Sequence, residues 1–148
     1  MARLTLYFPA SIADVIGGDL LNTLNGDPVF QRKVKGTGIM IKDLLDNASE
    51  ACAKTPKVRD ALDKASAWAA CMDEVLASIA EYVKTGSGGD SEVDGTGVTV
   101  GQVAKPIMDA CRSTTAKVYE DVEENTRACA LDVVSVSRLR LREVFASI

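Results

Sequence analysis

The chain has 148 residues, 47% of them apolar, so it is long enough to bury a core as one domain without a metal ion or a disulfide. Its formal net charge of −4 disfavours a nucleic-acid partner, because that affinity needs clustered lysines and arginines. No apolar run approaches the roughly 20 residues of a membrane-spanning helix, and the first residues lack a signal-peptide pattern. We therefore predict a soluble, cytoplasmic or intracellular protein with no membrane partner.

Residues 1–9 are expected to form a short extended arm. Leu4, Leu6 and Phe8 alternate with polar or amphipathic residues, as on one face of a strand, and Pro9 ends the segment. An extended segment of this kind can pair with the edge of another subunit. Leu4, Leu6 and Phe8 are therefore candidate interaction residues.

Three shorter helices are predicted before residue 56. The first carries an apolar stripe from Ile12 to Leu24, and the second begins with Asp27 as N-cap and Pro28 as first helical residue. The third is expected over residues 39–53.

A long central helix is predicted at about 56–84, after the cap-then-proline pair Thr55-Pro56. Apolar residues recur there at steps of three and four, which is typical of a helix packed lengthwise against others. The expected buried stripe is Leu62, Ala65, Trp68 or Ala69, Met72, Val75 or Leu76, Ile79 and Val83.

The glycine-rich segment 85–97, TGSGGDSEVDGTG, is predicted to be a flexible loop. It lacks the lysine and hydroxyl residue of a Walker phosphate loop, and it lacks the alternating ligands of a calcium-binding loop. A solvated connector is the favoured interpretation.

One long C-terminal helix or a pair of helices is predicted to follow, with Thr99 as a cap and an apolar pattern that runs to residue 133. Residues 133–145 fit either more helix or a strand that would pair with the arm; the helix is favoured because no turn signal intervenes. Arg138, Arg140 and Arg142 form a basic segment, opposite in sign to the acids at 120–124, and are further candidate interaction residues.

The four cysteines are expected to be reduced and buried. If residues 38–53 and 56–84 are two helices that meet at a turn, Cys52 and Cys71 lie about 20 Å apart. On one continuous helix, Cys111 and Cys129 lie about 27 Å apart. Both distances exceed the reach of a disulfide, so only crossed pairs such as Cys71 with Cys111 remain as an alternative.

Catalysis and metal binding are not predicted. The chain has no histidine and no CxxC motif, so the usual triads, dyads and zinc sites cannot form. The acid pairs, Asp43 with Asp46 among them, have the spacing of ordinary exposed helix residues. We expect a protein that is not an enzyme and holds no cofactor or metal.

One stretch resembles a known family. The sequence AACMDEVLASIAEYVKTGSGGDSE, which contains Cys71, is similar to the chromophore-bearing segment of phycobiliprotein subunits. In that family a bilin-linked cysteine follows two alanines on a helix that ends in a Gly-Asp loop. Two shorter matches, GGDLLNTL at 17–24 and NAS at 47–49, precede it in the same order.

The resemblance implies Cys71 as a thiol attachment point for a chromophore, with Asp73 and Glu74 as shifted candidates for the carboxylate that meets the bilin nitrogens. Residues 66–68, Ser-Ala-Trp, stand where the family has basic residues before the cysteine.

The sequence as a whole predicts a single all-α domain over residues 1–148, a bundle of four to six helices. The long stripe, the arm and the basic segment offer more surface than one small bundle needs for itself. We therefore expect a non-enzymatic structural or protein-interaction subunit, viral or cellular, that binds itself or another protein. The alternative is a small-ligand or chromophore carrier with its attachment at Cys71.

Overall fold

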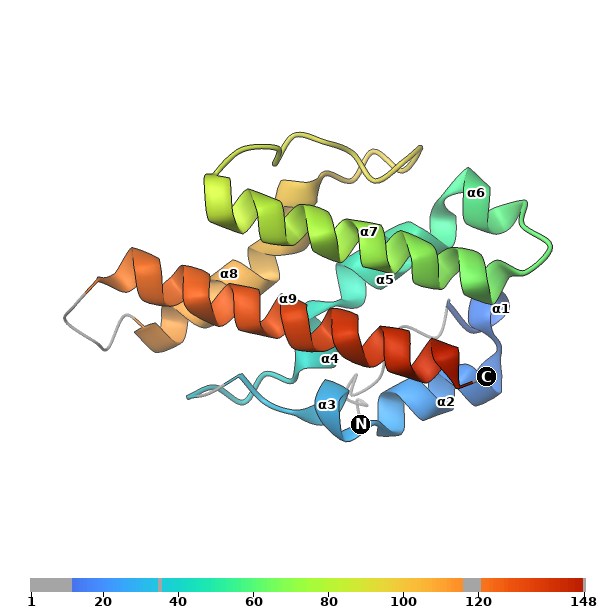
Figure 1. Cartoon of the computed structure of the whole chain (residues 1–148), viewed down its shortest axis with the longest axis horizontal. Helices are drawn as coiled ribbons and strands as arrows, with labels where there is room; N and C mark the ends of the chain where they lie inside the picture. The colour runs from blue at the N-terminus through green and yellow to red at the C-terminus, as the bar shows by residue number, and fades with distance from the viewer. Residues whose placement is uncertain (1–11, 35, 116–120, 148) are drawn as a thin grey trace, which may run out of the picture.

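The protein is an all-α helical bundle, as the sequence predicts (Figure 1). The computed structural model describes residues 12–34, 36–115 and 121–147; at residues 114 and 115 it describes the backbone alone. Within these ranges there are helices and no strand. The helices are α1 (Ala13–Ile16), α2 (Gly18–Gly26), α3 (Pro28–Gln31), α4 (Ile41–Leu44), α5 (Asp46–Lys54), α6 (Pro56–Arg59), α7 (Lys64–Thr85), α8 (Val100–Thr115) and α9 (Val122–Ala146).

Helices α7 and α9 form the centre of the bundle and run antiparallel, side by side (Figure 1). Helix α8 packs against both, and the short N-terminal helices cover the remaining sides. The stripe predicted for α7 is largely confirmed, because Trp68, Met72, Leu76 and Ile79 are fully buried. None of the described helices combines the length and apolar character that a membrane crossing requires.

The predicted helix starts are confirmed by their capping bonds. The Asp27 carboxylate accepts a hydrogen bond from the backbone N–H of Val29 at 2.9 Å. The Thr55 hydroxyl accepts one from the N–H of Val58 at 3.3 Å. Thr99 caps α8 in the same manner. These caps satisfy N–H groups that a helix leaves without internal partners.

The central helix is shorter than predicted. Its first turn is a separate helix, α6, and α7 begins only after a four-residue connection with Asp63 as its N-cap. The Asp63 carboxylate accepts hydrogen bonds from both the N–H and the hydroxyl of Ser66, at 3.1 and 2.7 Å. Leu62, which was expected in the buried stripe, is therefore in the connection and fully exposed.

The prediction of reduced cysteines is wrong. Disulfides join Cys52 to Cys71 and Cys111 to Cys129, and the Cα atoms are 5.7 Å apart in each pair. The reason lies in the shape of the chain, since the connection after α6 brings α7 back along α5. Helices α8 and α9 are likewise separate and pack together, so the structure has the helix pair and not the one continuous helix on which the distance from Cys111 to Cys129 was based.

The C-terminal segment is helical, which settles the choice left open over residues 133–145, since α9 continues to Ala146. The arm at residues 1–9, with Leu4, Leu6 and Phe8, lies outside the described residues.

The glycine-rich segment folds into a hydrogen-bonded turn beside α7 and α8. Helix α7 ends at Gly86, whose φ of 73° is the left-handed conformation that favours glycine. Further on, the N–H of Val93 donates to the carbonyl of Val98 at 2.8 Å, and Val93 is buried. The segment thus carries an apolar anchor that attaches it to the core.

Candidate functional site

Helix α7 presents two neighbouring acids to different surroundings. Successive residues on a helix point about 100° apart, since one turn takes 3.6 residues. Asp73 faces α9 and meets its arginines, whereas Glu74 lines a pocket on the side of the glycine-rich segment. The two candidates for the carboxylate of the resembled family therefore belong to two different sites.

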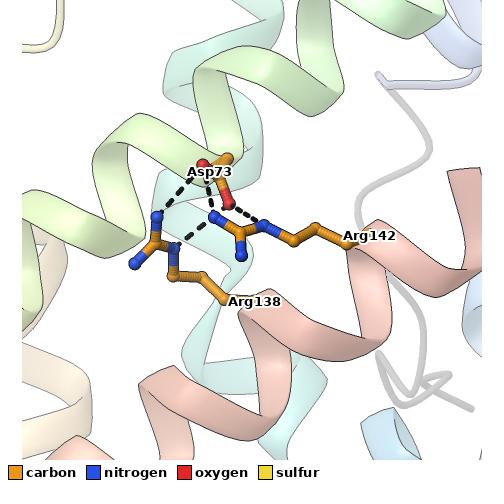
Figure 2. Close-up of polar contacts among 3 residues, drawn as sticks. All are labelled: Asp73, Arg138 and Arg142. Atoms are coloured by element: carbon orange, nitrogen blue, oxygen red, sulfur yellow. Dashed lines mark hydrogen bonds and ion pairs between the residues drawn. The ribbon is translucent and has the colours of Figure 1, made fainter.

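Asp73 is held by two arginines of α9 (Figure 2). Arg138 donates through Nε and Nη2 to the two carboxylate oxygens, both at 3.1 Å. Arg142, one turn later on the same face, donates in the same way at 2.9 and 3.2 Å. The hydrogen bonds from Arg138, and then those from Arg142, lower the pKa of Asp73 to about 2. Two guanidinium groups against one carboxylate leave the cluster with one excess positive charge.

Arg140 points to another part of the bundle. Its Nε donates to the buried carboxylate of Asp27 at 2.7 Å, and its Nη1 donates to Glu143 at 3.3 Å. The hydrogen bond with Asp27 is the main cause that raises the pKa of Arg140. All three arginines predicted as interaction residues thus attach α9 to other helices of the same chain. The spacing of four residues between Arg138 and Arg142 was the only sequence signal that these two bind the same side chain.

A basic groove runs beside the Asp73 cluster, between α7 and α9, with a volume of about 400 Å³. Arg138, Arg142 and Lys84 supply its positive charge. Leu139 borders it with 59% of its surface exposed, although it is a large apolar residue. The remaining lining residues are Ala80, Leu131, Val134 and Ser135. The groove therefore combines cationic and apolar surface that the bundle itself leaves uncovered.

A second hollow, the α7 pocket, lies between α6, α7 and the glycine-rich segment and has a volume of about 360 Å³. Cys71 is half-buried in its wall. The sulfur of Cys71 is bonded to Cys52, so it offers no thiol for attachment of a chromophore. The thiol-attachment interpretation of Cys71 is therefore contradicted in this disulfide-bonded form.

Asp43 in α4 and Asp46 at the start of α5 are less exposed than their spacing suggested. Asp43 and Asp46 each have one buried carboxylate oxygen without a hydrogen-bond partner. Burial, and then the charges of Asp43 and Glu50, raise the pKa of Asp46 to about 7. Burial also lowers the pKa of the neighbouring Lys42, which is 2% exposed. Among the described residues, no group of three or more potential ligands is placed to hold a metal ion.

No protein-family model, curated protein or solved structure matches this chain. The functional interpretation therefore rests on the basic groove and the α7 pocket.

Proposed function

We propose that the protein is a non-enzymatic protein-binding subunit that self-associates through the basic groove and Leu139. The observation that supports this proposal is the exposed side chain of Leu139 beside three cationic side chains in the groove. Asp73 is bound to two of these cations, and its single negative charge neutralises only part of their positive charge. An exposed apolar side chain with a charged border is typical of a surface that a partner covers.

The proposed occupant of the groove is a second copy of the chain, which carries complementary charge at the other end of α9. Asp121, Glu123 and Glu124 are exposed there, and Glu123 also pairs with Arg112 of its own chain at 3.6 Å. Glu123 precedes Arg138 by 15 residues, which is about 22 Å along a helix, too far for pairing within one α9. The pKa of Glu124 is raised by its hydrogen bond and charge interaction with Asp121, and a cation from a neighbour would relieve this crowding. Acid-to-base contact of this kind is head-to-tail.

The arm is a second proposed contact. Leu4, Leu6 and Phe8 would add to a neighbouring subunit as an extended segment. Deletion of residues 2–8 should leave a folded protein that associates less; unchanged association would remove the arm from the proposal.

The compartment proposed for this protein is oxidising. Two disulfides are typical of secreted, periplasmic or otherwise oxidising surroundings and are rare in the reducing cytosol. This proposal replaces the cytoplasmic location expected from the sequence.

The decisive variant is Leu139→Glu, which adds a charge to the groove without removing any of the arginine–carboxylate bonds. Its matched control is Leu62→Glu, because Leu62 is a fully exposed leucine in the connection before α7. Light scattering during gel filtration should show a smaller mass for Leu139→Glu and an unchanged mass for Leu62→Glu. Equal masses for the two variants and the wild type would contradict the proposal.

Charge reversal at the other end tests the same contact. Glu124→Lys should weaken association, and combination with Leu139→Glu should restore part of it, since the new charges are again opposite in sign. Lys105→Glu on α8 controls for a change in charge at an exposed site outside both regions.

A further inference from the structure

The α7 pocket has the form of a small-molecule site. Its volume of about 360 Å³ is within the roughly 300–1,000 Å³ of ligand pockets. The buried valines 58, 75, 93 and 100 contribute apolar surface, together with Ala67 and Ala70. An apolar floor of this kind favours a ligand with a hydrocarbon body.

The frame of the pocket is fixed from several sides. The Cys52–Cys71 disulfide joins α7 to α5 next to the pocket wall. The glycine-rich turn packs closely on the start of α6, since a Cβ at Gly95 would lie only 3.0 Å from Cδ of Pro56. The N–H of Val100 donates to the carbonyl of Ser91 at 2.8 Å and closes the turn. A preorganised hollow costs little ordering when a ligand binds.

The charged residues of the pocket are predominantly acidic. Glu74, Glu92 and Asp94 line it, against the single cation Lys57. Lys57 lies 3.9 Å from Asp94, so these two charges offset each other. Glu92 accepts one hydrogen bond, from the N–H of Gly97 at 3.1 Å, and keeps its second oxygen available. Two carboxylates, Glu74 and Glu92, therefore remain to meet a positive group.

We propose that the α7 pocket binds a small amphipathic cation, an organic ammonium with an aliphatic body, without a covalent bond. The aliphatic body lies on the valine and alanine floor, and the ammonium meets Glu74 and Glu92. This inference goes beyond the proposed self-association and uses none of the residues of the basic groove, so either can fail alone.

Three probes of equal chain length and different charge test the inference: n-octylammonium, 1-octanol and octanoate. Binding to the full, disulfide-bonded chain is measured by chemical-shift changes in NMR titrations. Octylammonium should bind about tenfold more tightly than octanol, with octanoate weakest, because partly exposed ion pairs each contribute modestly. Equal affinity for the three probes, or no binding of octylammonium, would overturn the inference.

Two variants locate the bound probe. Ala70→Phe fills the pocket from an exposed position and should abolish binding of both octylammonium and octanol. Glu74→Gln keeps the shape and should weaken octylammonium about threefold while octanol is unchanged. Glu81→Gln, an exposed acid of α7 outside the pocket wall, is the matched control. Octylammonium binding that Ala70→Phe leaves intact would place the probe elsewhere and contradict the assignment.

Discussion

Ionisation of the Asp46 side chain opposes folding near neutral pH. Burial, and then the charges of Asp43 and Glu50, disfavour the carboxylate and raise its pKa from the ordinary 3.8 to about 7 in the folded protein. The folded state therefore holds the proton more tightly. This contribution to stability is complete below about pH 4 and is lost as the pH rises towards 7.

Asp46→Asn should remove this pH dependence and make the protein more stable than wild type at pH 8. After allowance for solvent screening at a half-buried site, the gain is on the order of 1–2 kcal/mol. Urea unfolding between pH 4 and pH 8 measures it, with Asp60→Asn, an exposed acid, as the control. A wild-type stability that does not fall across this range relative to Asp46→Asn would refute the assignment.

Asp73 has the opposite linkage. Its pKa is lowered to about 2 by the hydrogen bonds of Arg138 and Arg142, so its contribution is present above about pH 4 and is lost as the pH falls towards 2. Asp73→Asn should cost about 1–2 kcal/mol at pH 7, because two guanidinium groups then lie together without a carboxylate. Glu74→Gln, the next residue, should cost little. Thermal unfolding distinguishes the two variants, and equal losses would contradict the structural role of Asp73.

Among the helices, each disulfide joins two helices covalently. Cys52–Cys71 links α5 to α7 across 19 residues, and Cys111–Cys129 links α8 to α9 across 18. Loops of this length correspond to about 3 kcal/mol for each bond. Replacement of either pair by alanines should lower the free energy of unfolding by about that amount. Peptide mapping without reductant checks the pairing, and crossed pairs or free thiols would contradict the structure.

The helices themselves were largely predictable, because caps and periodicity act locally. Asp27, Thr55 and Thr99 identified helix starts from the sequence, and the stripe from Trp68 to Val83 identified the buried face of α7. The break before Lys64 was missed because Leu62 fits the apolar period although it is exposed. That error placed Cys52 and Cys71 too far apart, and the assumption of one continuous helix did the same for Cys111 and Cys129. Together they led to the wrong prediction of reduced thiols.

The sites were less predictable, because they depend on contacts between distant segments. Arg138 and Arg142 were identified as interaction residues, but Asp73, 65 residues away from Arg138, could not be assigned as their partner from spacing. The buried oxygens of Asp43 and Asp46 were missed for the same reason, since a spacing of three residues on a helix fits an exposed face as well as a buried one.

On the surface of the folded molecule, the basic groove and the α7 pocket carry charges of opposite sign. The basic groove lies between α7 and α9, and the acidic α7 pocket lies beside the glycine-rich segment. A chain with a net charge of −4 that keeps three cations in one groove has a surface suited to an acidic partner. Association driven by such charges should weaken as salt is raised, because exposed charges are screened.

Self-association of the folded chain can be measured by light scattering during gel filtration. The wild-type protein should be measured over a range of concentrations, with its disulfides intact and at low and high salt. We expect a defined oligomer or polymer whose mass rises with concentration and falls with salt. A monomer at every concentration and salt would contradict it.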